Sequence, residues 1–186
     1  MAELCSIRKV YPRGATPVVA LDGVTLTVRQ GEKLAIMGGS NGGLLVGAVA
    51  TQRPELINAV VCQVPLLDMK RYHKLLAGAS WMAEYGDPDD PEQWETISRY
   101  SPYQNVRRDV KLPKMLITTS TRDDRVHPGH ARKMAARLAE FGHDVLYYEN
   151  IEGGHGGAAD NAQRALIQAL EFTYLWQQLG PVSASK

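Results

Sequence analysis

Cysteine is scarce in this sequence. The 186 residues include only Cys5 and Cys62, which are too few for a disulfide framework and lack the spacing of a metal site. The first residues, MAELCSIRKVYPRG, contain no apolar stretch of the kind found in a signal peptide. We therefore expect a cytoplasmic protein without a structural metal.

Long apolar runs and an excess of one charge are also missing. The longest uninterrupted run of apolar or glycine residues, GGLLVGAVA at 42–50, is far shorter than the roughly 20 residues that span a bilayer. The formal net charge is +1, which gives no reason to expect nucleic acid or an anionic membrane as a partner. The sequence predicts neither a membrane segment nor a nucleic-acid site.

What the sequence does contain is an alternation of short apolar strands and helices. Residues 17–29 alternate and are rich in Val and Thr, as in a strand and hairpin. Further strands are expected at 33–37, 59–65, 114–120 and 144–150, and helices at 42–52, 128–142 and 160–180. This order predicts an α/β fold with a mostly parallel sheet, helices on both of its faces and an N-terminal β-hairpin.

The segment 66–109 interrupts this alternation. Two short helices are expected in it, at 66–76 and 91–100, the second with Asp90 as its N-cap. The segment also concentrates the aromatic residues Trp81, Tyr85, Trp94, Tyr100 and Tyr103. Such a concentration outside the strands and helices of the sheet predicts a pocket wall or cap.

The glycine-rich stretch MGGSNGG at 37–43 admits two chemistries, and the first is phosphate binding. Residues 1–38 resemble the opening of an ABC-transporter ATPase, with Tyr11 where that family stacks an aromatic ring on adenine. A phosphate loop needs G-x-x-x-x-G-K-[ST], but Leu44 and Leu45 stand where the lysine and hydroxyl belong. We therefore expect no nucleotide cofactor, and an ATP-binding subunit is the weakest alternative.

The second chemistry is nucleophilic attack by Ser40. Residues 38–42 fit G-x-S-x-G between an apolar strand and a helix of small residues, which is the context of a nucleophile elbow. We expect side chains at Gly38 and Gly42 to collide with their neighbours, and the Asn41 N–H to donate to an oxyanion. An incidental serine in a glycine-rich turn is the alternative.

Residues that could activate the serine follow later strands. Asp123 and Asp124 follow the strand 114–120, and His155 lies on a loop after the strand 144–150. The order Ser, Asp, His is that of α/β-hydrolases. Glycines flank His155, and we expect them to let it approach Ser40 closely.

From about residue 33 to 180 the chain resembles the C-terminal half of the catalytic domain of the prolyl oligopeptidase family of serine peptidases. The motifs that carry the resemblance are GGSNGGLL, QRPEL, LLDM, YHK, W-x-x-x-YG, YSPYQNV, DDRVHP and GGHGG. The resemblance implies an α/β-hydrolase fold that cleaves short peptides, usually after proline. It implies Ser40 as nucleophile, Asp123 rather than Asp124 as acid, His155 as base and Asn41 as oxyanion donor.

The resemblance also implies a substrate pocket. Trp81 would stack on the substrate proline ring, Tyr85 and Val126 would help to form the wall, and Arg125 would bind a substrate carbonyl. Leu66 occupies another pocket position, where the family often has a smaller apolar residue.

The sequence departs from the family before residue 33. The β-propeller and first sheet strands of the family, with a tyrosine that completes the oxyanion hole, have no counterpart here. We expect a partial α/β-hydrolase, with an ATPase-like β segment at 1–32 and a catalytic region at 33–186, produced by fusion or truncation. An exposed sheet edge would favour a homo-oligomer, and the alternative to a peptidase is a non-catalytic association module.

Overall fold

The computed structural model describes residues 2–12 and 16–180. The chain divides into two compact units, Met1–Leu34 and Ala35–Lys186. The predicted domain boundary after residue 32 stays a prediction.

The first unit is a two-stranded antiparallel hairpin. Strand β1 (Ala2–Tyr11) pairs with β2 (Val18–Val28), so the predicted N-terminal β-hairpin is confirmed. The segment 17–29, however, is one strand and not a hairpin by itself. Between two successive paired positions, β2 contains three residue steps where β1 contains two, which forms a bulge. Gly23 lies in this bulge, and its left-handed backbone (φ +67°) is accommodated there.

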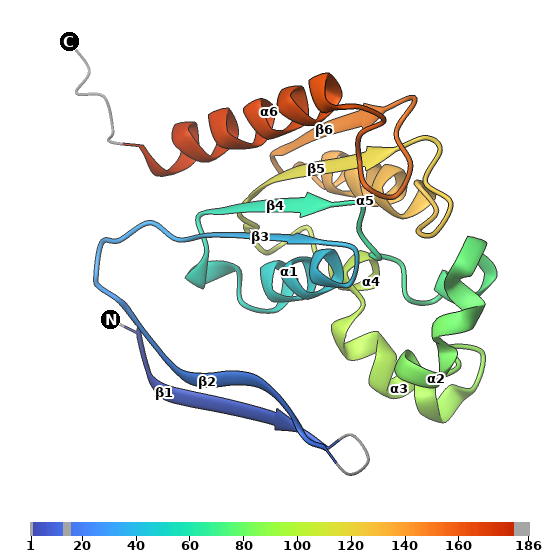
Figure 1. The fold of residues 1–186 in the computed structure, drawn as a ribbon, viewed down its shortest axis with the longest axis horizontal. Helices are drawn as coiled ribbons and strands as arrows, with labels where there is room; N and C mark the ends of the chain where they lie inside the picture. Colours follow the sequence, from blue (N-terminus) through green and yellow to red (C-terminus); the bar gives the residue numbers. More distant parts are fainter. Residues whose placement is uncertain (1, 13–15, 181–186) are drawn as a thin grey trace. The chain divides into compact units, whose positions relative to one another are not determined.

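The second unit contains a four-stranded parallel sheet in the order β3-β4-β5-β6 (Figure 1). Its strands are β3 (Ala35–Gly39), β4 (Ala59–Gln63), β5 (Lys114–Ser120) and β6 (Val145–Asn150). All four strands run the same way, so their carboxyl ends meet at one edge of the sheet. The predicted parallel α/β fold is confirmed.

Helices cover both faces of this sheet. Apolar side chains of α1 (Asn41–Gln52) and α5 (Gly129–Glu140) pack with β4 and β5 in the main core on one face. On the other face, Tyr174 of α6 (Asn161–Leu179) packs against Val61 and Leu116. Its hydroxyl donates to the Lys114 carbonyl at 2.6 Å, which fixes α6 to the sheet.

The connection between β4 and β5 forms a separate aromatic layer. It contains 3₁₀ turns at Tyr72–Lys74 and Leu76–Trp81, and short helices α2 (Met82–Tyr85), α3 (Pro91–Tyr100) and α4 (Pro102–Asn105). Its apolar core, here called the aromatic cluster, comprises Leu44, Leu66, Met69, Tyr72, Ile97 and Val126, with Trp81, Met82, Tyr85, Trp94 and Tyr100 packed against it.

The two helices predicted for this segment have different outcomes. The helix at 91–100 is α3, with Asp90 accepting from the Glu92 N–H at 2.9 Å as its N-cap. The helix predicted at 66–76 is wrong. The N–H groups of Asp68 and Met69 donate to side chains far along the chain, His130 and Ser101, which holds the segment out of a helical ladder.

One predicted member of the aromatic layer lies elsewhere. Tyr103 packs against the main core, where the cationic groups of Lys133 and Arg137 each lie 4.5 Å from its ring centre. The other four aromatic residues predicted for this layer, Trp81, Tyr85, Trp94 and Tyr100, belong to the aromatic cluster.

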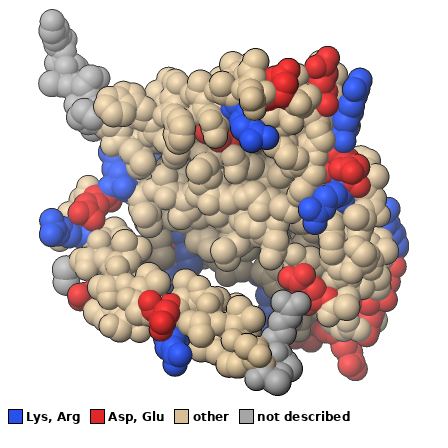
Figure 2. Space-filling model, viewed as in Figure 1, with Lys and Arg blue, Asp and Glu red and all other residues tan. Residues whose placement is uncertain are grey.

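Over most of the face shown in Figure 2, Lys and Arg lie among Asp and Glu, whereas Asp and Glu gather at its lower right edge. Within the described ranges, no helix combines the length and apolar character needed to cross a bilayer. Within the described residues β3 pairs only with β4, so β3 is an edge strand of the sheet. A homo-oligomer formed through this edge stays a prediction.

Leucines of α5 and α6 provide a matched test of the core. Leu138 is 1% exposed in the main core and Leu166 is 51% exposed on α6. We expect Leu138→Ala to lower the free energy of unfolding by about 2–5 kcal/mol because it leaves a cavity, and Leu166→Ala to change it by about 0.5 kcal/mol or less. Urea denaturation followed by circular dichroism checks this, and equal losses for both would contradict the assigned core.

Candidate active site

Ser40 stands at a sharp turn between β3 and α1. Its backbone has φ 56° and ψ −117°, a conformation that a non-glycine residue adopts only under strain. The Ser40 N–H donates to the Gln63 carbonyl at 2.9 Å, and the Ser40 carbonyl accepts from the Leu44 N–H at 3.1 Å. These bonds to β4 and to the first turn of α1 hold the strained residue in place.

The glycines around Ser40 contribute differently to this turn. A Cβ on Gly38 would lie 2.3 Å from the Gly42 carbonyl oxygen, so the expected collision at Gly38 is confirmed. At Gly42 the expectation is wrong, because a Cβ on this residue would meet no atom within 4 Å. The second tight position is Gly43, whose Cβ would lie 2.6 Å from Pro65.

The structure brings Ser40, Asp123 and His155 together from the ends of three strands. The His155 Nε2 atom lies 3.1 Å from the Ser40 Oγ, and the His155 Nδ1 atom lies 2.9 Å from the Asp123 Oδ2. Both distances are within hydrogen-bonding reach. With Nδ1 protonated, His155 donates to the carboxylate and presents a free lone pair on Nε2 to the serine hydroxyl.

Asp123 is held by its own loop. The side chain is fully buried, and its Oδ1 accepts from the N–H groups of Arg125 and Val126, each at 2.9 Å. Asp124 is exposed to solvent. The geometry therefore distinguishes the two adjacent aspartates, and only Asp123 among them faces the imidazole.

In the loop that carries His155, the glycine that packs closely against the backbone is not one of the two that flank the histidine. A Cβ on Gly153 would lie 2.6 Å from the Gly157 carbonyl oxygen, whereas Gly154 and Gly156, the immediate neighbours of His155, have room.

Two further polar side chains secure this loop. The Gly157 carbonyl accepts from Ser120 Oγ at 3.0 Å and from Asn150 Nδ2 at 2.9 Å. Neither Ser120 nor Asn150 was predicted from the sequence, although each is a polar residue at the end of its strand, β5 or β6, and this position was a signal for them.

The N-terminus of α1 points its free N–H groups toward the same region. The first N–H groups of a helix have no intrahelical acceptor and carry the positive end of its dipole. Asn41 is the first residue of α1, and its side-chain Oδ1 accepts from the Tyr85 hydroxyl at 2.8 Å. Burial raises the pKa of Tyr85 to about 12, so this phenol stays protonated and able to donate at neutral pH.

A cavity opens beside this helix end. Its lining comprises Asn41, Gly42, Leu44, Leu45, Ala48, Tyr85 and Tyr100. The lining is mostly apolar, and it joins the first turns of α1 to the aromatic cluster.

Of the residues predicted for the substrate pocket, Tyr85 lines this cavity. Trp81 and Tyr85 are half-buried in the aromatic cluster. Leu66 and Val126 belong to the same cluster but are only 2% exposed, so they support its inner side and offer little open surface. Arg125 is exposed, next to the Asp123 loop.

One group of side chains has the composition of a metal site. Ligand atoms of His73, Asp87 and Asp89 lie within 4.8 Å of one another. The Asp89 Oδ2 atom, however, already contacts Lys74 Nζ at 2.7 Å and His73 Nε2 at 3.1 Å. Since the lysine ammonium occupies the position next to this carboxylate, we assign the group a structural ion-pair role.

Comparison with known proteins identifies one family of peptidases. The family model described as "Prolyl oligopeptidase family" matches residues 24–182. An uncharacterized peptidase of Sinorhizobium fredii is 53% identical over 161 residues, which cover 87% of this chain and 22% of that protein. The prolyl endopeptidase of Dictyostelium discoideum is 40% identical over 130 residues, covering 67% of this chain and 17% of that protein.

Solved structures give the same picture. A post-proline cleaving enzyme from Rickettsia typhi has a TM-score of 0.77 and 44% identity, covering 78% of this chain and 21% of that chain. Prolyl oligopeptidase B from Galerina marginata has a TM-score of 0.71 and 33% identity, covering 78% of this chain and 21% of that chain. The chain spans about a fifth of the length of the curated relatives that it matches.

Gly38 and Gly42 provide a matched pair for the serine turn. We expect Gly38→Ala to lower the free energy of unfolding by about 1–3 kcal/mol because its methyl group would overlap the Gly42 carbonyl. Gly42→Ala, with open space around it, is expected to be neutral or slightly stabilising. Thermal unfolding measured by calorimetry compares them, and a tolerated Gly38→Ala would show that the turn is looser than described.

Proposed function

This chain belongs to the prolyl oligopeptidase family of serine peptidases, and we propose that it hydrolyses short peptides after proline through an acyl-enzyme on Ser40. The observation that carries the proposal is the Ser40–His155–Asp123 arrangement, with 3.1 Å between Oγ and Nε2 and 2.9 Å between Nδ1 and Oδ2. These distances match the requirement for a nucleophile, a base within proton-transfer reach and a group that orients the base.

In the proposed reaction, Ser40 Oγ attacks the carbonyl carbon of the scissile bond while His155 Nε2 takes the hydroxyl proton. The resulting imidazolium is stabilised by the buried Asp123 carboxylate, and it returns the proton to the leaving amine as the C–N bond breaks. A water molecule then attacks the acyl-enzyme with His155 again as base. The peptide acid is released and Ser40 regains its proton.

The proposed oxyanion donor is the backbone N–H of Asn41. It lies directly after the nucleophile, at the positive end of α1, where negative charge on the tetrahedral intermediate is stabilised most. A single such donor contributes about 10²–10³ in rate in serine peptidases. The Tyr85 hydroxyl bond to Asn41 Oδ1 supports the position of this residue.

The aromatic cluster is the proposed proline pocket. Trp81 would stack against the pyrrolidine ring, and Tyr85 would form the wall beside the open cavity. Leu66 and Val126 would fix these rings from behind, because they are buried in the same cluster. The exposed Arg125 guanidinium would bind a substrate carbonyl.

The names of similar proteins support a proline preference. One solved relative is described as a post-proline cleaving enzyme, and several curated relatives are named prolyl endopeptidases or prolyl oligopeptidases. This chain spans about a fifth of their length. The activity is therefore proposed only for the unit that contains Ser40, Asp123 and His155.

A serine-reactive fluorophosphonate tests the nucleophile. We expect the wild-type chain to be labelled and Ser40→Ala to remain unlabelled, because the reagent needs an activated serine hydroxyl. Labelling is measured by intact-mass spectrometry and mapped by peptide digestion. Absence of labelling in a folded wild-type chain would favour the association-module alternative over the peptidase.

The adjacent aspartates supply a control for the acid. We expect Asp123→Asn to lower kcat/KM for a fluorogenic prolyl amide by about 10⁴-fold, because the imidazole would lose its orienting carboxylate. Asp124→Asn changes an exposed side chain and should alter the rate by less than about threefold. Equal effects of the two substitutions would rule out the assignment of Asp123.

A further inference from the structure

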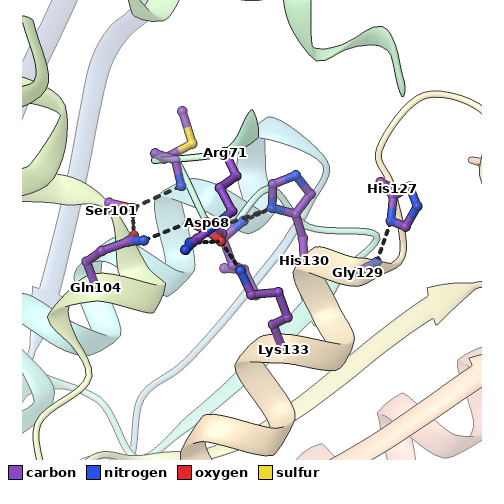
Figure 3. A network of polar contacts seen from close by, with 10 residues as sticks. Asp68, Arg71, Ser101, Gln104, His127, Gly129, His130 and Lys133 are labelled. Atoms are coloured by element: carbon purple, nitrogen blue, oxygen red, sulfur yellow. Dashed lines mark hydrogen bonds and ion pairs between the residues drawn. The ribbon is translucent and has the colours of Figure 1, made fainter. Parts of the chain in front are cut away.

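A buried carboxylate paired with more exposed basic side chains lies behind the aromatic cluster. Asp68 follows β4, and its side chain has no exposed surface. Its carboxylate pairs with Lys133 of α5, accepts from Gln104 Nε2 at 2.7 Å and contacts Arg71 Nη1 at 3.0 Å (Figure 3). Burial alone would raise the pKa of Asp68, but the hydrogen bonds from Lys133 and Gln104 hold it below its ordinary value.

A buried histidine completes this network. His130, in the first turn of α5, is 2% exposed, and its Nδ1 atom accepts from the N–H groups of Asp68 at 3.1 Å and Leu67 at 3.4 Å. Burial lowers the pKa of His130 to about 4, so the ring is neutral at neutral pH and Nδ1 keeps its lone pair. Figure 3 shows this ring directed at the Asp68 segment.

A serine ties the same segment to the helices of the aromatic layer. Ser101, between α3 and α4, accepts from the Met69 N–H at 3.0 Å and donates to Gln104. We call Asp68, Arg71, Ser101, Gln104, His130 and Lys133 the Asp68 junction. It joins the segment after β4, the α3–α4 corner and the start of α5.

Each of these three segments continues into a wall or support of the proposed site. Leu66, two residues before Asp68, packs in the aromatic cluster, while Leu67 packs in the main core. Helix α3 supplies Trp94 and Tyr100 to the aromatic cluster. The loop leading into α5 carries Asp123 and Val126. The junction therefore connects the pocket wall to the loop that holds the acid.

Stability alone is a weak reason for this arrangement. Desolvation of the buried Asp68 carboxylate offsets much of its attraction to Lys133 and Arg71. The directional bonds that His130 and Ser101 accept from consecutive backbone N–H groups do, however, fix one position of the segment. Fixing position is the property that a shape-selective pocket requires.

We propose that the Asp68 junction is a specificity-determining positioning element, which sets where the aromatic pocket wall stands relative to Ser40 and so governs recognition of proline. The proposal rests on the proposed function for the identity of the pocket's occupant. It predicts that loss of a junction bond weakens binding of a proline side chain, while Ser40 keeps its reactivity toward a small reagent that does not use the pocket.

The test compares two substitutions of His130 in a Ser40→Ala background, which binds peptide without turning it over. Asn can present an acceptor oxygen near the position of Nδ1, whereas Leu of similar size cannot. We expect His130→Leu to raise the Kd of N-acetyl-Gly-Pro-Gly-amide about tenfold, and His130→Asn to stay within about twofold. Calorimetry with the matched Gly-Ala-Gly peptide should show a smaller change, so that the preference for proline falls.

A second pair keeps the test valid if His130→Leu does not fold. Ser101→Ala removes the acceptor of the Met69 N–H, while Ser98→Ala removes a hydroxyl that bonds only within α3, to the Glu95 carbonyl at 3.0 Å. We expect Ser101→Ala to weaken binding of the proline peptide and Ser98→Ala to leave it unchanged. In the background with Ser40 intact, both should be labelled by fluorophosphonate at the wild-type rate.

The outcomes separate the two proposals. Unchanged proline binding in folded His130→Leu and Ser101→Ala would overturn the junction proposal, as would parallel losses for the proline peptide, the alanine peptide and labelling. A parent chain that binds no proline peptide would overturn it too. A third outcome would refute only the proposed hydrolysis. In it, fluorophosphonate does not label the wild-type chain, but the chain binds the proline peptide selectively and the junction variants lose this selectivity.

Discussion

The parallel alignment of β3, β4, β5 and β6 is the constraint on which the site depends. Parallel strands bring their carboxyl ends to one edge, so residues more than a hundred positions apart can face one another there. Ser40 follows β3, Asp123 follows β5 and His155 follows β6. A one-residue slip of a strand would turn its side chains to the opposite face and displace the following loop.

The strain at Ser40 is sustained by the same sheet. The Ser40 N–H bond to the Gln63 carbonyl continues the β3–β4 pairing past the last residue of β3, and the following N–H groups begin α1. Only a backbone without a side chain at Gly38 allows α1 to start so close to the strand. A left-handed residue therefore persists at the turn because its neighbours determine its position on both sides.

The sequence could predict the sheet, the helices on its faces and the family, because these depend on local periodicity and on short motifs. It could also predict which residues would meet, because Ser40, Asp123 and His155 each follow a recognisable strand. The loop at 66–69 could not be predicted in this way, since its conformation is set by bonds to Ser101 and His130 that lie more than thirty residues away. The same holds for the tight glycines, where Gly153 and Gly43 are distinguished from Gly156 and Gly42 only by tertiary neighbours.

A covalent adduct provides the most direct test of the central claim, that Ser40 is a nucleophile served by His155 and the start of α1. The measurement is a crystal structure of the chain after reaction with a fluorophosphonate. We predict a phosphonyl group on Ser40 Oγ, with one oxygen about 3 Å from the Asn41 nitrogen and the His155 ring still bonded to Asp123. An adduct whose oxygens all point away from α1, or a modification on another residue, would contradict the claim.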